Sequence, residues 1–192
     1  IMPIVLNGSG TISGVSAGGL PDGIIQAADL ASGVGGKILQ VVSVTKTNVF
    51  TVSGTTTFTD VPNLSVNITP SSSSNKILVV YDMAWGNSDG HASCRLMRDS
   101  TPIKIGDQAG SNKSRVTGQM HLGSTQDQYD LEQVAGSILD TPNTTSQVTY
   151  KMQIGTPYSS SYNVFCNYHY EGSDAAWAGR GASAITVMEV AA

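Results

Sequence analysis

Two segments of the chain match Gly-x-Ser-x-Gly, the pattern that carries the nucleophilic serine of many hydrolases: residues 14–18 and residues 86–90. The pattern works only where a strand precedes the serine and a long helix follows it, because that sharp turn exposes the hydroxyl beside its oxyanion donors. The first segment lies in a glycine-rich leader, and the second joins two predicted strands. Neither segment therefore predicts a nucleophile.

Metal and acid–base chemistry have equally little support. His91, His121 and His169 stand apart along the sequence and form no zinc-binding motif such as His-Glu-x-x-His. The 14 acidic residues are spread singly, so no carboxylate pair of the kind that glycosidases use can be identified. The sequence predicts no enzyme, no cofactor and no resident metal, although an ion held by histidines on a trimer axis stays open.

Aromatic residues are concentrated near the C-terminus. Six of the twelve lie between residues 158 and 177, namely Tyr158, Tyr162, Phe165, Tyr168, Tyr170 and Trp177. One interpretation places these rings in the core and in contacts between subunits. The other places some of them on loops that bind a ligand.

The ligand-binding interpretation concerns the loops at 158–161 and 171–180. Aromatic rings stack on the C–H faces of sugars, while short polar side chains bind the hydroxyls. The receptor-contact candidates on these loops are Tyr158, Asp174, Trp177 and Arg180. A second candidate edge, around the loop 86–90, holds Trp85, Asn87 and Asp89.

The composition restricts the classes of partner. Only 12% of the 192 residues are charged, about half the usual share. The net charge of −4 and the scattered Lys and Arg residues argue against nucleic acid, whose phosphates require clustered cations. No run of apolar residues is long enough for membrane insertion. Cys94 and Cys166 each lie in a strand pattern, and we expect free, buried thiols rather than a disulfide.

Residues 1–36 form a leader interrupted by closely spaced glycines, which do not hold an isolated helix or strand. Within it, Asp22 is a suitable N-cap and Gly33 a suitable stop for one short helix. Such a helix is marginal alone, so its small apolar face is expected to pack against other copies around a symmetry axis. The residues of this predicted trimer collar are Ile24, Ala27, Ala28 and Ala31.

From Lys37 onward the apolar pattern has a period of two, which predicts strands. The first strand, from residue 38, is apolar on both faces and is predicted to be internal. Residues 77–85 and 148–154 alternate cleanly, whereas 124–139 fits a strand or a long loop. About ten short strands predict an all-β fold: an antiparallel, jelly-roll-like β-sandwich over residues 37–192, preceded by the extended leader and its short helix.

Several segments together resemble bacteriophage tail-fibre and related virion-fibre proteins. The junction carries LPDG at 20–23, LASG at 30–33 and GKILQVV at 36–42. The resemblance continues through FTDV at 58–61, LSVNITP at 64–70, SNKILV at 74–79, RLMRDS at 95–100, IGD at 105–107, LDTP at 139–142, TYK at 149–151, RGAS at 180–183 and ITVMEV at 185–190. It covers nearly the whole chain after Leu20.

The resemblance implies a non-enzymatic homotrimer, made in the bacterial cytoplasm and located in the virion. Residues 1–36 would attach to a tail or baseplate protein, and the sandwich would contact a host surface glycan or outer-membrane protein. The variable stretches at 84–92 and 158–178 would carry the host contacts. Two alternatives remain: a baseplate or capsid-decoration protein that binds only virion proteins and, less favoured, a depolymerase that cuts surface polysaccharide.

Overall fold

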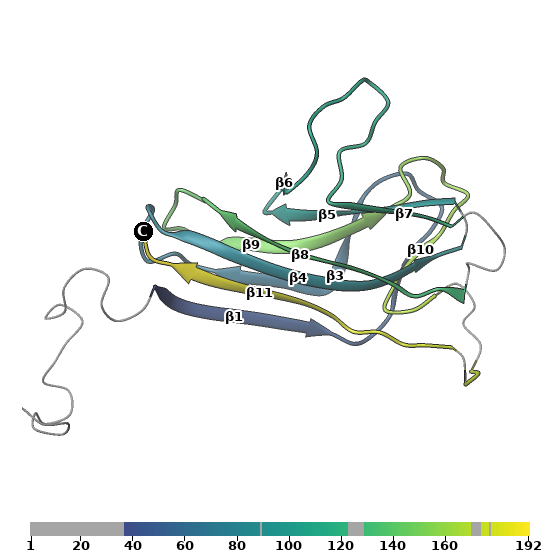
Figure 1. Cartoon of the computed structure of the whole chain (residues 1–192), viewed down its shortest axis with the longest axis horizontal. Helices are drawn as coiled ribbons and strands as arrows, with labels where there is room; N and C mark the ends of the chain where they lie inside the picture. The colour runs from purple at the N-terminus through teal and green to yellow at the C-terminus, as the bar shows by residue number, and fades with distance from the viewer. Residues whose placement is uncertain (1–36, 89, 123–128, 170–173, 177) are drawn as a thin grey trace, which may run out of the picture. The chain divides into compact units, whose positions relative to one another are not determined.

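The computed structural model describes residues 37–88, 90–122, 129–169, 174–176 and 178–192. The predicted leader and its collar residues Ile24, Ala27, Ala28 and Ala31 lie outside these ranges, so both stay predictions. The described residues form eleven strands in two antiparallel sheets and contain no α-helix (Figure 1). Nothing in these ranges is a helix of the length and apolarity that a membrane crossing requires.

The first sheet is built around the long strand β4. Its members are β1 (Ile38–Lys46), β2 (Phe50–Val52), β4 (Lys76–Asn87), β8 (Glu132–Asp140), β10 (Val164–Cys166) and β11 (Ser183–Val190). β8 pairs with one edge of β4, and both β11 and β10 pair with the other edge, one after the other. β1 then pairs with β11, and β2 pairs with β10.

In the second sheet, too, two short strands pair one after the other along one edge of a longer strand. Its members are β3 (Thr59–Ile68), β5 (Gly90–Arg98), β6 (Thr101–Ile103), β7 (Gly118–Leu122) and β9 (Val148–Gly155). β9 lies between β3 and β5. β6 and β7 share the remaining edge of β5, β6 beside residues 96–98 and β7 beside residues 90–94.

The connectivity is that of a jelly roll. Each of the pairs β1–β2, β6–β7 and β10–β11 is one interrupted strand, so the eleven strands reduce to eight. Counted along the chain, these eight lie in the order first, eighth, third, sixth in one sheet and second, seventh, fourth, fifth in the other. Two interleaved sheets of four strands define the jelly-roll architecture. The predicted all-β sandwich is thereby confirmed.

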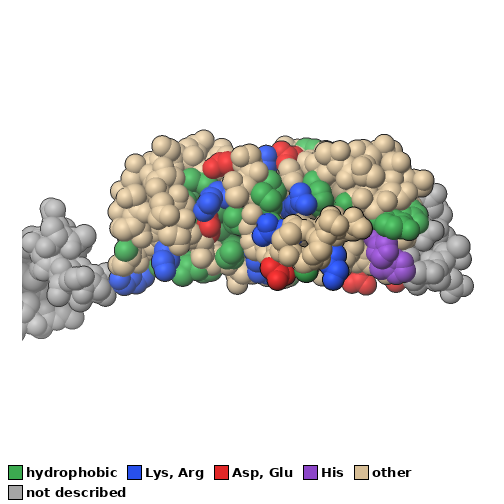
Figure 2. Space-filling model, turned by 90° about the horizontal axis from the view of Figure 1, so that it is seen from above, with side chains coloured by type: hydrophobic (Ala, Val, Ile, Leu, Met, Phe, Trp, Pro, Cys, Tyr) green, Lys and Arg blue, Asp and Glu red, His purple; other side chains and the backbone are tan. Residues whose placement is uncertain are grey.

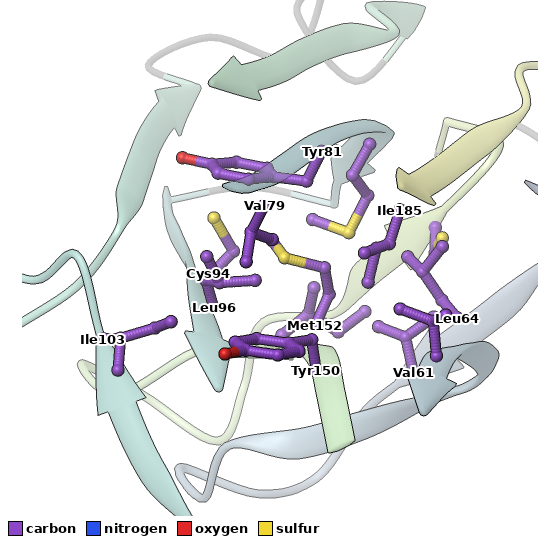
Figure 3. Close-up of a cluster of buried hydrophobic side chains, with 14 of the residues drawn as sticks. Val61, Leu64, Val79, Tyr81, Cys94, Leu96, Ile103, Tyr150, Met152 and Ile185 are labelled. Atoms are coloured by element: carbon purple, nitrogen blue, oxygen red, sulfur yellow. The ribbon is translucent and has the colours of Figure 1, made fainter. Parts of the chain in front are cut away.

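The core lies between the two sheets, and alternate residues of each strand fill it (Figure 3). Val79, Tyr81 and Ile185 enter from the first sheet, and Leu96 and Met152 from the second. The predicted inward faces of residues 77–85 and 148–154 are confirmed, since every second residue there is buried. Both cysteines are free and buried, as expected, and burial raises the pKa of the Cys94 thiol to about 12.

Two strand predictions need correction, and one open alternative is resolved. β1 is an edge strand rather than an internal one. The stretch 124–139, predicted as a strand or a loop, contributes β8 from Glu132 onward. A strand expected over 162–170 is confined to Val164–Cys166, because the chain leaves the sheet after Cys166 and returns only at Ser183.

Side-chain hydrogen bonds hold the chain in place at the breaks between β6 and β7 and between β10 and β11. Between β6 and β7 the chain leaves as a long loop, residues 104–117, that projects from the sandwich (Figure 1). The Thr117 hydroxyl closes it, accepting a hydrogen bond from the Leu96 amide at 2.9 Å and donating to the Ile103 carbonyl at 3.4 Å. Between β10 and β11, the Asn167 side chain accepts a hydrogen bond from the Ser183 hydroxyl and donates to the Lys46 carbonyl.

The sandwich has two distinct ends. Ile38 pairs with Val190, which pairs with Lys76, so the start of β1 and the C-terminus share one end. The opposite end holds the β4–β5 turn, where β5 begins, and the loop between β9 and β10. We name these the Ile38 end and the His91 end.

Candidate assembly and binding surfaces

An apolar row crosses the outer face of the first sheet. Strand register places Val41, Met188, Leu78 and Leu139 side by side on all four strands. Val41 is 55% exposed and Leu139 is 49% exposed. Solvated faces of antiparallel sheets usually carry polar residues, so this outer row is an unusual feature for a face that meets only water.

The rows around the outer row carry one cation and one anion on β4, Lys76 on one side and Asp82 beyond Val80 on the other. Val80 is exposed in the neighbouring row, where its partners are Thr186 and Ser137. Ile38 and Leu39 are also exposed at the start of β1, whose free edge has no strand partner among the described residues. The face is therefore apolar, nearly neutral and continuous with an open strand edge, as a surface that contacts another protein would be.

The outer face of the second sheet is the opposite case. Lys151 forms an ion pair with Asp60 at 2.7 Å, and Gln153 donates a hydrogen bond to the same carboxylate. Burial alone would raise the pKa of Asp60, but these hydrogen bonds and the Lys151 charge lower it. The Arg95 guanidinium lies 3.8 Å from the centre of the Phe58 ring. Polar groups on this face thus find partners within the chain.

A cluster of rings lies at the His91 end. His91 on β5 and His121 on β7 are cross-strand partners, and their ring centres are 4.3 Å apart. The Tyr158 ring meets His91 edge-on at 5.3 Å and stacks on Tyr162 at 6.2 Å. Figure 2 shows histidine side chains gathered at one end of the molecule, whereas Lys and Arg side chains are spread along it.

A pocket of about 500 Å³ opens beside these rings. The second sheet contributes His91 and Gln119, the loop between β6 and β7 contributes three residues, and the loop after β9 contributes two. The lining residues are His91, Asn112, Lys113, Ser114, Gln119, Pro157 and Tyr158. The described lining residues supply a cation, imidazole, amide and hydroxyl groups and a phenol, and none of them supplies a carboxylate.

Local geometry explains why Tyr158 projects outward. The Ser159 amide donates to the Thr156 carbonyl at 3.1 Å, and the Thr156 hydroxyl donates to the Thr55 carbonyl at 2.9 Å, so the turn is fixed at its base. Gly90 has φ +69°, and a Cβ there would lie 2.4 Å from the Tyr162 ring. Glycine at this position therefore allows Tyr162 to pack against the β4–β5 turn and to support Tyr158.

The structure separates the predicted receptor contacts. Tyr158 is 72% exposed and lines the pocket. Asp174 and Arg180 are exposed but do not line it, and Arg180 lies over the Tyr168 ring instead. Asp89 and Trp177 are outside the described residues.

Trp85 and Asn87, which are predicted as exposed receptor contacts, are buried. Trp85 is 3% exposed because it continues the inward face of β4, although it borders a smaller hollow of about 250 Å³ between β7 and β8. Asn87 is 0% exposed, and its amide donates to the Gly90 carbonyl at 2.9 Å. Both residues therefore stabilise the strand and its turn and do not offer a surface.

Sequence reasoning missed most of the pocket. The sequence pattern predicts no common site for His91 and His121 and no role for Asn112, Lys113, Ser114 and Gln119. The alternation around His91 and around His121 indicates two strands, but only their register places the rings together. That register depends on how the loop 104–117 interrupts the strand, which no local pattern reveals. Among the described residues, no group of three His, Cys, Asp or Glu side chains is placed to hold a metal ion.

Comparison with known proteins adds little beyond the fold. The sequence matches no protein-family model and no curated protein. The structure is similar to that of infectious bursal disease virus Gx strain, with a TM-score of 0.40, 12% identity, and coverage of 79% of this chain and 37% of that chain. It is also similar to the VP2 subviral particle of the same virus, with a TM-score of 0.34, 12% identity, and coverage of 79% and 38%.

The chain spans well under half the length of these two matched chains. Similarity at these TM-scores carries no argument about function.

Proposed function

We propose that the chain is a homotrimeric virion-fibre protein of the bacteriophage tail-fibre type, attached to the particle by residues 1–36 and touching the host surface with its jelly-roll head. The observation that carries the proposal is the polarity of the sandwich. Residue 37 joins it at the Ile38 end, while the exposed ring pocket lies at the His91 end. A protein that is tethered at one end and binds with the other requires this arrangement.

The outer row supports self-association. Three copies that bury Val41 and Leu139 against one another would remove exposed apolar surface from water, which favours assembly. The low charge of the face means that identical copies meet without repulsion. The predicted collar at Ile24 and Ala28 would add a second contact between copies.

Light scattering on the full chain tests the trimer. We expect three times the 20.0 kDa chain mass at micromolar concentration, and Val41→Asp or Ile24→Asp should lower it by placing three charges near the axis. Ser65→Asp, an exposed change on the outer face of the second sheet, is the matched control. A monomeric unmodified protein would contradict the proposal.

Host contact is tested by adsorption. Tyr158→Ala should reduce adsorption of particles to cells without lowering the trimer mass, because the ring is exposed and its loss leaves the core intact. Tyr129→Ala removes another exposed tyrosine, outside the pocket lining, and is the control. Unchanged adsorption in the Tyr158 variant would place the receptor contact elsewhere.

A second candidate is a baseplate or capsid-decoration protein, because the outer row equally suits another virion protein. Labelling the protein on the particle, at tail, baseplate or capsid, distinguishes the two. The proposal includes no catalysis. Release of reducing ends from host polysaccharide, abolished by a single Asp or Glu change, would establish the depolymerase alternative instead.

A further inference from the structure

We propose that the pocket at the His91 end binds an acidic saccharide, a sugar that carries a carboxylate. This inference deepens the proposed host contact and rests on it for its biological meaning. Its chemistry, however, comes from the lining of the pocket and can be tested on the purified chain alone.

The exposed ring of Tyr158 is held in place by neighbouring rings. A ring that leaves 72% of its surface in water gains little from burial, so its position is maintained by its neighbours. Tyr162 stacks on it with an angle of 10° between the planes, and His91 meets it edge-on. A ring held in this way is already placed for stacking on the C–H face of a sugar, at a low cost in side-chain entropy.

The second argument is the polar lining. Asn112 and Gln119 offer amides and Ser114 offers a hydroxyl, the groups that exchange hydrogen bonds with sugar hydroxyls. Lys113 supplies an ammonium group, and none of the described lining residues has a carboxylate. Since the whole chain has a net charge of −4, a described lining with one cation and no carboxylate favours an anion over a cation at this place.

The third argument is size and position. Pockets for small ligands usually measure about 300–1,000 Å³, and this one measures about 500 Å³. Its residues come from one sheet and two loops, so they converge on a bound ring from different sides. We assign Tyr158 to the sugar face, Lys113 to the carboxylate, and Asn112 and Gln119 to the hydroxyls.

The test compares methyl glucuronide with methyl glucoside, which share a sugar ring and differ in the carboxylate. Titration of the full-length protein, followed by calorimetry or NMR, should show the glucuronide binding at least about fivefold more tightly, as a charge-assisted contact predicts. Lys113→Gln should abolish that preference while the glucoside still binds. Tyr158→Ala should weaken both sugars about tenfold, in keeping with the loss of one stacking contact.

The controls separate the pocket from the rest of the surface. Tyr129→Ala and Lys76→Gln remove an exposed tyrosine and an exposed lysine outside the pocket lining, and both should leave the affinities unchanged. Sodium acetate and inorganic phosphate serve as sugar-free anions. If either binds as tightly as the glucuronide, the site recognises anions in general and the saccharide assignment is overturned.

The remaining outcomes are also decisive. Equal affinity for the two methyl glycosides, absence of binding, or affinities that Tyr158→Ala leaves unchanged would each overturn the inference. Intact sugar binding in a protein that plays no part in adsorption would refute the proposed host contact and leave the pocket assignment standing. Adsorption that depends on Tyr158 but not on Lys113 or on acidic sugars would refute the pocket assignment and leave the proposed host contact standing.

Discussion

The two ends of the sandwich satisfy their polar groups in different ways. At the Ile38 end, the carboxylate of Glu189 is buried. It accepts hydrogen bonds from the backbone amide and the hydroxyl of Ser71 and from the side-chain amide of Asn75, each at 2.7 Å, and a further one from the Gln40 side chain. At the same end, Asp140 accepts hydrogen bonds from Arg98 and from the Tyr150 hydroxyl. Both carboxylates join strands to neighbouring strands or loops.

The His91 end leaves polar atoms unsatisfied. The Asn87 Oδ1 and Ser93 Oγ atoms are buried there without a hydrogen-bond partner among the described residues, and the Tyr158 ring stays in water. Unsatisfied or exposed groups of this kind reduce stability, and folds tolerate them mainly where a surface has another use. The difference supports the proposed binding role of the His91 end, although the Asn167–Ser183 pair on the side of that end is fully hydrogen-bonded.

The largest effect should come from removing the carboxylate at the Ile38 end. Glu189→Ala removes the charged acceptor of four hydrogen bonds, one from the buried Asn75 side chain and the others from Gln40 and Ser71 nearer the surface. A hydrogen bond to a charged group contributes about 1.5–3 kcal/mol. We expect a loss of about 3 kcal/mol or more in the free energy of unfolding, measured by urea at neutral pH and a fixed chain concentration. Glu132→Ala, at an exposed position, is the control. A loss below about 1 kcal/mol would remove the basis of the comparison.

The same carboxylate predicts an acid limit. Burial alone would raise the pKa of Glu189, but the hydrogen bonds from Asn75, Gln40 and Ser71 lower it from its ordinary value of 4.5 to about 2. Because the folded-state pKa is depressed, the stabilisation is complete above pH 4.5 and is lost as the pH falls through about 2. Glu189→Gln should flatten the stability profile across that window, and an unchanged slope would contradict the prediction.

A smaller effect is expected at the neighbouring carboxylate. Tyr150→Phe removes the 2.6 Å hydrogen bond to Asp140 but leaves Arg98 in place, so the loss should be about 1–2 kcal/mol. Burial and the nearby Asp140 raise the pKa of Tyr150, and the hydroxyl therefore remains a donor at every physiological pH. Tyr158→Phe, which changes a tyrosine that is 72% exposed, should have little effect on the same urea curve.

The smallest effect should be at the His91 end. Ser93→Ala removes a buried hydroxyl that makes no hydrogen bond among the described residues, so the free energy of unfolding should stay the same or rise by up to about 1 kcal/mol. Ser183→Ala is the matched case, because that hydroxyl donates to Asn167 and accepts from the Ala84 amide, and it should destabilise. A destabilising Ser93→Ala would show that this end is as fully satisfied as the other.

Much of the fold could be predicted because alternation is a local signal. The inward faces of β4 and β9 are legible in the sequence for this reason. β8 was ambiguous because it contains Gly136, which lowers strand propensity. The structure supplies the cause: a Cβ there would lie 2.8 Å from the Lys104 and Tyr81 side-chain tips, which hydrogen-bond to each other.

The prediction that β1 is internal fails for a different reason. β1 is apolar on both faces, which predicts burial on both sides, but the fold of one chain buries only the side that carries Val42 and Val44. Alternation of apolar residues indicates that a face of the strand is apolar. It does not indicate whether the same chain or another molecule packs against that face. The pocket was missed for a related reason, since its residues meet only through the pairing of strands distant in the chain.

The interrupted strand that contains the loop 104–117 has a consequence for how this surface can change. The Thr117 hydroxyl and amide contact Leu96, Ile103 and Cys94 where the chain returns, and Lys104 and Arg115 form hydrogen bonds with Tyr81 and Arg95 at the base of the loop. The sheet therefore depends on the base of the loop more than on residues 106–114. Extending a closed loop costs only about 0.6 kcal/mol per doubling of its length. The segment can therefore be exchanged for one of different length and chemistry, and recognition at the tip can diversify while the scaffold beneath it stays the same.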